Sequence, residues 1–145
     1  MHAFFAYGTL LHPEVLEAVT GRAFAPEPAT LPGHARYCVK GAVYPAAVAE
    51  PGASIEGALY RGLDDACLEA LDRFEGSLYR RVRREVALAA GGRARAYVYE
   101  IASGRRDVLE PLPWDPAAFA SRHLARYVAA CRASRGPRAA PAVGG

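Results

Sequence analysis

The sequence has few cysteines and no metal-type pattern of histidines. Its three cysteines are odd in number and widely spaced, which argues against a disulfide framework and against a cysteine-type zinc site. Its four histidines are scattered without the spacing of metal ligands, so we expect no metal and no cofactor. These residues are Cys38, Cys67 and Cys131, and His2, His12, His34 and His123.

Long apolar runs are also missing. No stretch approaches the roughly 18 uninterrupted apolar residues that a membrane-spanning helix requires. The opening segment MHAFFAYGTLL has neither the basic region nor the small-residue cleavage site of a secretory signal peptide. We therefore expect a soluble, cytoplasmic protein with no membrane partner.

The charge is nearly balanced, with 18 basic and 15 acidic residues and a formal net charge of +3. Arginines gather in residues 80–84, but aromatic residues are not interleaved with them on one face, as binding to single-stranded nucleic acid requires. We therefore expect no nucleic-acid partner. On a strand through this segment, Arg81 and Arg83 would face solvent. Arg80 or Arg84 shares the inward side and could pair with a buried carboxylate.

A chain of 145 residues can bury roughly two-thirds of its unfolded surface in one core. We expect one domain over residues 1–131 and a flexible, basic tail, rich in Pro, Gly and Ala, over residues 132–145. Apolar periodicity and turn residues predict a mixed sheet and few helices. The expected strands are 3–7, 35–39, 43–48, 56–61, 79–88 and 93–101, and the expected helices run from Pro13 to a stop at Gly21, from the cap Asp64 to Glu75, and from the cap Asp115 through Cys131.

One carboxylate in the second helix falls on the apolar face. Glu75 lies four residues after Leu71 and seven after Leu68, so it shares their side of the helix. Burial and the helix C-terminus both disfavour its charged form, as suits a general base that works near neutral pH. The alternative is that Glu75 turns into solvent at the helix end, or pairs with Arg73 or Arg80.

The first strand ends at a glycine that precedes a helix. Gly8 allows a positive φ and a close backbone approach, and the N–H groups after it, with a helix dipole behind them, would bind a carboxylate or an oxyanion. The alternative is a plain turn from strand to helix.

Five segments together resemble the gamma-glutamylcyclotransferase-like family, which includes gamma-glutamylamine cyclotransferases and AIG2-like proteins. The most specific of them has the spacing D-x-F-E-G-x-x-Y-x-R. The segments are FAYGTL at 5–10, YPA at 44–46, EGALY at 56–60, LDRFEGSLYRR at 71–81 and AYVYE at 96–100.

The resemblance implies an α+β fold, a small mixed β-barrel with helices around it. It also implies an enzyme that converts a γ-glutamyl amine or amide into 5-oxoproline and a free amine, by attack of the substrate's own α-amino group. The family's catalytic glutamate falls on Glu75, and its loop that binds the glutamyl group falls on Tyr7, Gly8, Thr9 and Leu10. We further expect Tyr79 to pack near Glu75 or hydrogen-bond close to it.

The partner implied is a small γ-glutamyl substrate, bound by a monomer or a homodimer. Residues 103–114 and the tail are candidates for the leaving-group side of the site. Cys67 is a weaker candidate nucleophile, because its position between apolar helix residues is typical of a small core residue. We interpret Asp72 as a solvated surface carboxylate. A non-catalytic family member that binds a small ligand or a partner remains the alternative.

Overall fold

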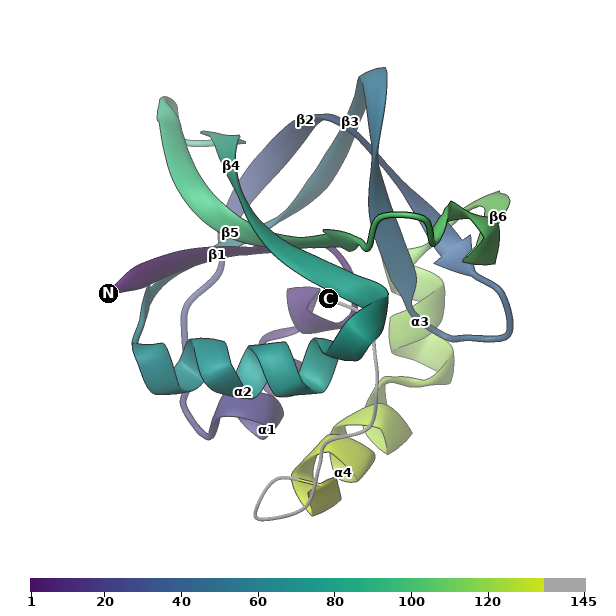
Figure 1. The fold of residues 1–145 in the computed structure, drawn as a ribbon. Coiled ribbons are helices and arrows are strands. Elements are labelled where there is room, and N and C mark those ends of the chain that lie inside the picture. The colour runs from purple at the N-terminus through teal and green to yellow at the C-terminus, as the bar shows by residue number, and fades with distance from the viewer. Residues whose placement is uncertain (135–145) are drawn as a thin grey trace.

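Six strands form one sheet, and their bounds follow runs of β-branched, aromatic and alternating apolar residues (Figure 1). The computed structural model describes residues 1–134. The strands are β1 (His2–Ala6), β2 (Glu27–Val39), β3 (Pro45–Leu63), β4 (Tyr79–Leu88), β5 (Arg93–Ile101) and β6 (Leu109–Pro113). The hairpin expected at 79–88 and 93–101 is confirmed, with Gly91 and Gly92 at positive φ in its turn.

Five of these strands close into a barrel. β1 pairs with β3, β3 with β2, β2 with β4 and β4 with β5, all antiparallel. A parallel contact between β1 and β5, with Phe4 opposite Tyr97, completes the ring. β6 extends the sheet beyond the ring by pairing with β2. The mixed α+β barrel implied by the family resemblance is therefore present.

The expected short strands between residues 35 and 61 are wrong. β2 and β3 are instead two long strands of 13 and 19 residues that form one extended antiparallel pair. Gly33, at a φ of +73°, lies where the register shifts between Pro32 and His34, and Gly52, at +85°, lies within β3. Gly33 suggested a chain break, but Gly33 and Gly52 both lie at irregularities inside continuous strands.

Four α-helices are present in the described residues, and three short 3₁₀ turns join elements. The helices are α1 (Pro13–Thr20), α2 (Asp65–Glu75), α3 (Pro116–Arg122) and α4 (Leu124–Ser134), and the turns are η1 (Thr9–Leu11), η2 (Gly76–Leu78) and η3 (Arg106–Val108). Asp64 caps α2 by accepting from the Cys67 N–H at 2.9 Å, as expected. None of the helices in residues 1–134 is long and apolar enough to cross a membrane.

The single helix expected after Asp115 is wrong, because the chain breaks at His123 into α3 and α4. The break lets the rings of Phe119 and Tyr127 meet edge to face, with 5.3 Å between their centroids. α4 runs to Ser134, three residues past the expected domain end, and the rest of the expected tail, residues 135–145, lies outside the described residues.

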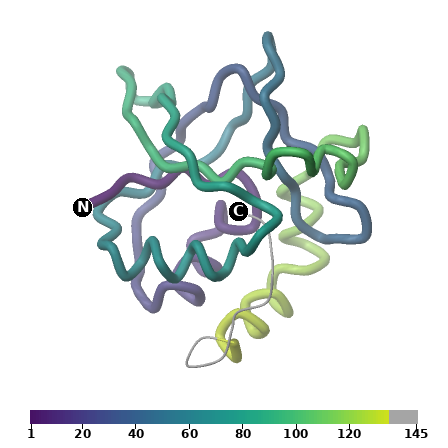
Figure 2. Tube along the Cα trace, viewed as in Figure 1, coloured from purple at the N-terminus to yellow at the C-terminus, as the bar shows by residue number. Residues whose placement is uncertain are grey.

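The barrel separates two apolar cores. Phe5 and Tyr7 point into the barrel, where strand residues such as Leu59 and Val98 surround them. Phe4 and Ala6, on the other side of β1, belong to the core between the barrel and the helices. Figure 2 shows the tip of the β4–β5 hairpin at the end of the molecule away from α4, and α1 packs against both α2 and α4.

Candidate functional site

Glu75 is the last residue of α2 and is 1% exposed. Its neighbours on the buried side of the helix include Leu71 and Phe74. Gly76 ends the helix with a φ of +70°, a conformation that favours glycine, and its N–H donates to the Asp72 carbonyl oxygen. The burial predicted for Glu75 is confirmed, and the alternative that this side chain turns into solvent is excluded.

The charge of Glu75 acts on four buried tyrosines that come from distant parts of the chain. Burial raises the pKa of each phenol, and the negative charge of Glu75 raises it further. All four therefore remain neutral hydroxyl groups at any ordinary pH. They are Tyr7 after β1, Tyr79 at the start of β4, Tyr99 in β5 and Tyr127 in α4. The role expected for Tyr79 near Glu75 stays a prediction, which the effect of the Glu75 charge on the Tyr79 pKa supports.

Hydrogen bonds fix these phenols in place. The Tyr7 hydroxyl donates to the Tyr99 carbonyl oxygen and accepts from the Ala47 N–H at 3.1 Å, so it joins β5 to β3. The Tyr79 hydroxyl donates to the Pro45 carbonyl oxygen at 2.7 Å, inside the YPA segment. Because both hydroxyl groups are hydrogen-bonded to backbone groups of β3 or β5, these two phenols chiefly fix the position of the strands at the site.

The other two phenols contact polar side chains. The Tyr99 hydroxyl donates to Asp72 Oδ1 at 2.7 Å, and Arg81 Nε lies 3.4 Å from the same oxygen. The hydroxyl of Tyr127 accepts from Thr9 Oγ1 at 3.3 Å. Asp72 is exposed, as expected of a surface carboxylate, but it also forms these two contacts. A signal was available, since Asp72 and Arg81 are the first and last residues of the D-x-F-E-G-x-x-Y-x-R pattern.

The loop from Tyr7 to Leu10 is buried, but its geometry differs from the expected one. Gly8 has a φ of −116°, so it does not adopt the positive φ that glycine allows. The loop continues into the short turn η1, in which the Leu11 N–H donates to the Gly8 carbonyl oxygen at 3.0 Å, and α1 begins only at Pro13. A long helix dipole therefore does not start at this loop.

Two residues that sequence reasoning missed hold the loop. Arg36 Nη1 donates to the Tyr7 carbonyl oxygen at 2.8 Å, and the Tyr60 hydroxyl donates to the Leu11 carbonyl oxygen at 3.0 Å. Both side chains come from strands far away in the sequence, so no local pattern marks them. They fix the carbonyl groups on the two sides of Gly8 and Thr9.

Cys67 faces the core beneath α2 and is 3% exposed. Burial, together with the hydrogen bond to Asp64, raises the pKa of its thiol. A thiol with a raised pKa is a poor nucleophile. The structure favours the interpretation of Cys67 as a small core residue.

A cavity of about 440 Å³ lies where the chain leaves the Glu75 helix. Ser77 and Leu78, which follow Glu75 and Gly76, form one wall, and Tyr44, next to the Pro45 carbonyl bonded by Tyr79, forms another. Arg105 and neighbouring residues of the 103–114 segment complete the lining. This segment therefore reaches the neighbourhood of the site, although its role as a leaving-group wall stays a prediction.

Known proteins resemble this chain in sequence. A family model described as "Gamma-glutamyl cyclotransferase, AIG2-like" matches residues 4–116. The chain is 38% identical over 85 residues to Protein AIG2 C of Arabidopsis thaliana, an alignment that covers 59% of this chain and 52% of that protein. The chain spans about half the length of the curated relatives it matches.

Two solved structures share the fold. A solution structure of an Arabidopsis thaliana protein superposes with a TM-score of 0.70 at 29% identity, covering 91% of this chain and 80% of that one. A structure named gamma-glutamyl cyclotransferase superposes with a TM-score of 0.62 at 19% identity, covering 70% of this chain and 66% of that one. At that identity the second likeness concerns the fold alone.

Proposed function

Because this chain belongs to the gamma-glutamyl cyclotransferase, AIG2-like family, we propose that it converts a γ-glutamyl amine or amide into 5-oxoproline and the free amine. The observation that carries the proposal is the burial of Glu75 at the end of α2, where its charge acts on four buried phenols that stay neutral. A carboxylate that is costly to bury is kept there although an apolar residue would suit the helix face better.

The reaction is a ring closure within the substrate. The α-amino nitrogen attacks the γ-carbonyl carbon, a C–N bond forms, and the carbonyl oxygen becomes an oxyanion. Collapse of this tetrahedral species breaks the bond between the γ-carbon and the amine, which leaves as the amine takes up a proton. The α-nitrogen gives up one proton before it attacks and a second as the ring amide forms, and the departing amine takes up one when its bond breaks and another on release as an ammonium ion. The enzyme therefore has to relay protons from one nitrogen to the other and hold one oxyanion, and it needs no nucleophile of its own.

Glu75 is the group that relays these protons. It takes a proton from the substrate's α-nitrogen and passes it to the departing amine, so that one carboxylate serves as general base and then as general acid. The phenols cannot replace it as a base, because burial and the Glu75 charge keep them protonated. Their rings and hydroxyl groups instead exclude water from the carboxylate and orient the strands around it.

The loop Tyr7, Gly8, Thr9 and Leu10 binds the glutamyl end of the substrate through backbone N–H groups, which receive the α-carboxylate or the oxyanion. This role draws support from the way Arg36 and Tyr60 fix the loop carbonyls, since a rigid loop holds donors in one geometry. It does not draw support from a helix dipole. Tyr79 binds the Pro45 carbonyl oxygen, next to Tyr44, which lines the 440 Å³ cavity, and this cavity receives the leaving amine.

The test is an assay for 5-oxoproline with a panel of γ-glutamyl amines, γ-glutamyl dipeptides and γ-glutamyl-ε-lysine. We expect wild type to release 5-oxoproline from at least one member. Glu75→Gln keeps the shape of the side chain and removes its basicity, so turnover should fall by about 10² to 10⁴-fold. Glu69→Gln, on the exposed face of the same helix, is the matched control and should keep wild-type turnover.

Near-normal turnover in a folded Glu75→Gln variant would contradict the assignment of the base. If wild type binds γ-glutamyl compounds but forms no 5-oxoproline from any of them, the chain is a non-catalytic member of the family that binds a small ligand.

A further inference from the structure

Three arginine side chains line a second cavity, of about 280 Å³, on the barrel side of β3 and β5. Arg80 and Arg84 lie on the same side of β4 as Val86, whose side chain belongs to the barrel core, whereas Tyr79 faces the helices. Arg106 enters the cavity from η3. Neither Glu75 nor the loop from Tyr7 to Leu10 lines this cavity, so the cavity is distinct from the candidate active site.

Glu100 is the one carboxylate among the described residues that line this cavity. Arg84 binds it in a bidentate manner, with Nε 2.7 Å from Oε2 and Nη2 3.0 Å from Oε1, and His34 Nε2 lies 2.8 Å from Oε2. Burial opposes the charge of Glu100, but Arg84 and His34 together hold its pKa below the ordinary value. One ionised carboxylate therefore faces three guanidinium groups, which leaves an excess positive charge.

The other two arginines keep unused donors. Arg80 donates from Nη1 to Ser103 Oγ at 3.0 Å, and its Nη2 is 3.9 Å from Glu100 Oε1. Arg106 donates from Nη2 to the Ala49 carbonyl oxygen at 3.0 Å. Each guanidinium carries five N–H donors, so most of those on Arg80 and Arg106 remain available.

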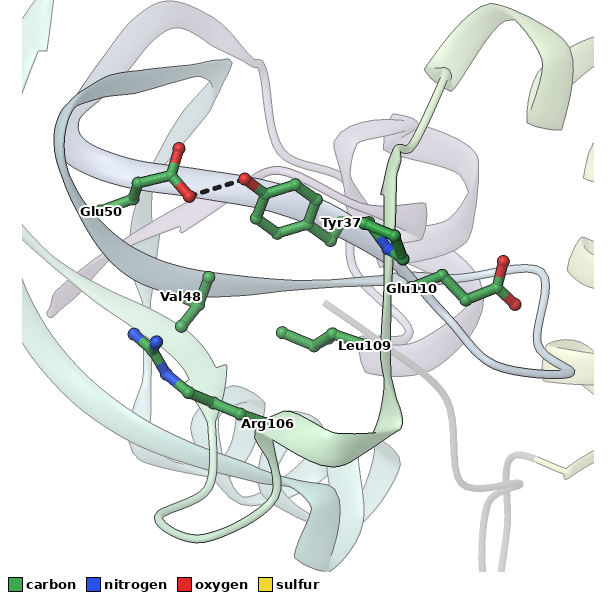
Figure 3. Close-up of a pocket in the computed structure, with 7 residues that line it drawn as sticks. Tyr37, Val48, Glu50, Arg106, Leu109 and Glu110 are labelled. Atoms are coloured by element: carbon green, nitrogen blue, oxygen red, sulfur yellow. Dashed lines mark hydrogen bonds between the residues drawn. The ribbon is translucent and has the colours of Figure 1, made fainter.

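The carboxylates beyond the cavity do not neutralise Arg106. Figure 3 shows the adjoining pocket, in which the Arg106 side chain lies beside Val48. There the Glu50 carboxylate accepts from the Tyr37 hydroxyl at 2.6 Å, and Glu110 points away from Arg106. In the described part of the chain, neither carboxylate lies within ion-pair distance of Arg106.

We propose that this cavity binds a small anion that carries a phosphate group or two carboxylates. Planar guanidinium forks match the oxygen spacing of both groups, and the low exposure of Glu100 shows that the floor of the cavity is shielded from water. The volume of about 280 Å³ has room for a phosphate or for a short dicarboxylate. The Ala47 backbone lies between the two sites, since it lines this cavity and also donates to Tyr7.

The experiment is a calorimetric titration of the full chain with inorganic phosphate and, separately, with succinate, at constant ionic strength with chloride as the balancing anion. Wild type should bind at least one of the two saturably. Arg80→Gln and Arg106→Gln should each weaken that binding by about tenfold, because each removes charge-assisted hydrogen bonds. Tighter binding of phosphate identifies a phosphate-bearing ligand, and tighter binding of succinate identifies a dicarboxylate.

Arg83→Gln is the matched control, because it removes the same charge from the same strand. The Arg83 guanidinium lies over the Tyr97 ring, 5.0 Å from its centroid, on the other side of the sheet. The affinity of the Arg83→Gln variant for the anion should stay within twofold of the wild-type affinity. Absence of saturable binding in wild type, or equal weakening by all three substitutions, would overturn the proposal. Arg84 is not substituted, because its loss would remove the bidentate ion-pair partner of the buried Glu100 carboxylate.

Discussion

Tyr79 shows how a single phenol can hold the candidate site together. Its hydroxyl is deeply buried and donates to the Pro45 carbonyl oxygen at 2.7 Å, where β3 begins. Tyr79→Phe would leave that buried carbonyl without its donor, which costs about 1 to 3 kcal/mol. We expect urea unfolding to report a loss of this size. Tyr97→Phe, on the half-buried ring that Arg83 covers, should change stability by less than about 0.5 kcal/mol.

The sequence predicts the burial of a single residue well only where the repeat of a helix or a strand places that residue on an apolar face. Glu75 is predictable because it repeats the spacing of Leu68 and Leu71 on one helix. Tyr99 and Tyr127 come from a strand and a helix far from α2, so nothing near Glu75 in the sequence marks them as its neighbours. The φ of Gly8 could not be predicted, because glycine permits a positive φ without requiring it.

Among the elements, β1 and β3 meet at a glycine that allows unusually close contact. A Cβ atom placed on Gly57 would lie 2.3 Å from the Ala6 carbonyl oxygen and 2.7 Å from the Phe5 ring. Ala6 is the last residue of β1, directly before the loop at Tyr7. Gly57→Ala must therefore push β1 and the loop away from β3, and we expect it to destabilise the fold by about 2 kcal/mol or more.

The measurement is urea unfolding, combined with the 5-oxoproline assay. Ser54→Ala, at an exposed position of the same strand, is the control and should leave both readouts near wild type. A Gly57→Ala protein with wild-type stability would show that β1 and β3 can separate freely, against the contact described above.

Elements with complete local signals were predicted closely, and those shaped by distant contacts were not. The α2 helix has its cap and its terminating glycine in the sequence, and the β4–β5 hairpin has its turn. The continuity of β3 depends on partners on both sides, including β1 and β2, which hold the strand together across Gly52. The break between α3 and α4 depends on the packing of Phe119 against Tyr127, which local propensity does not encode.

Over the whole molecule, closure of the barrel depends on a contact between distant parts of the chain. β1 and β5 meet in parallel, with Phe4 opposite Tyr97, and composition or periodicity cannot distinguish such a closed ring from an open sheet. The prediction of a barrel came from the family resemblance instead. The pairing of Arg84 with a buried carboxylate was predicted from parity on the strand, and the carboxylate is Glu100.

This buried pair makes the stability of the barrel depend on pH. Arg84 and His34, from β4 and β2, hold the pKa of Glu100, on β5, below its unfolded value, and Arg80 lies 3.9 Å from the carboxylate. A depressed carboxyl pKa contributes stability above the unfolded pKa of about 4.3, and the contribution is lost as the pH falls through the folded pKa.

The free energy of unfolding of wild type, measured by urea unfolding, should therefore fall between about pH 6 and about pH 3. The free energy of unfolding of Glu100→Gln should fall less over that pH interval, because this variant lacks the contribution of the Glu100 carboxylate at both pH values. Glu85→Gln, which removes an exposed partner of Arg93, should behave as wild type. An equal acid-induced loss in wild type and Glu100→Gln would show that strands β2, β4 and β5 are not held together by this charge.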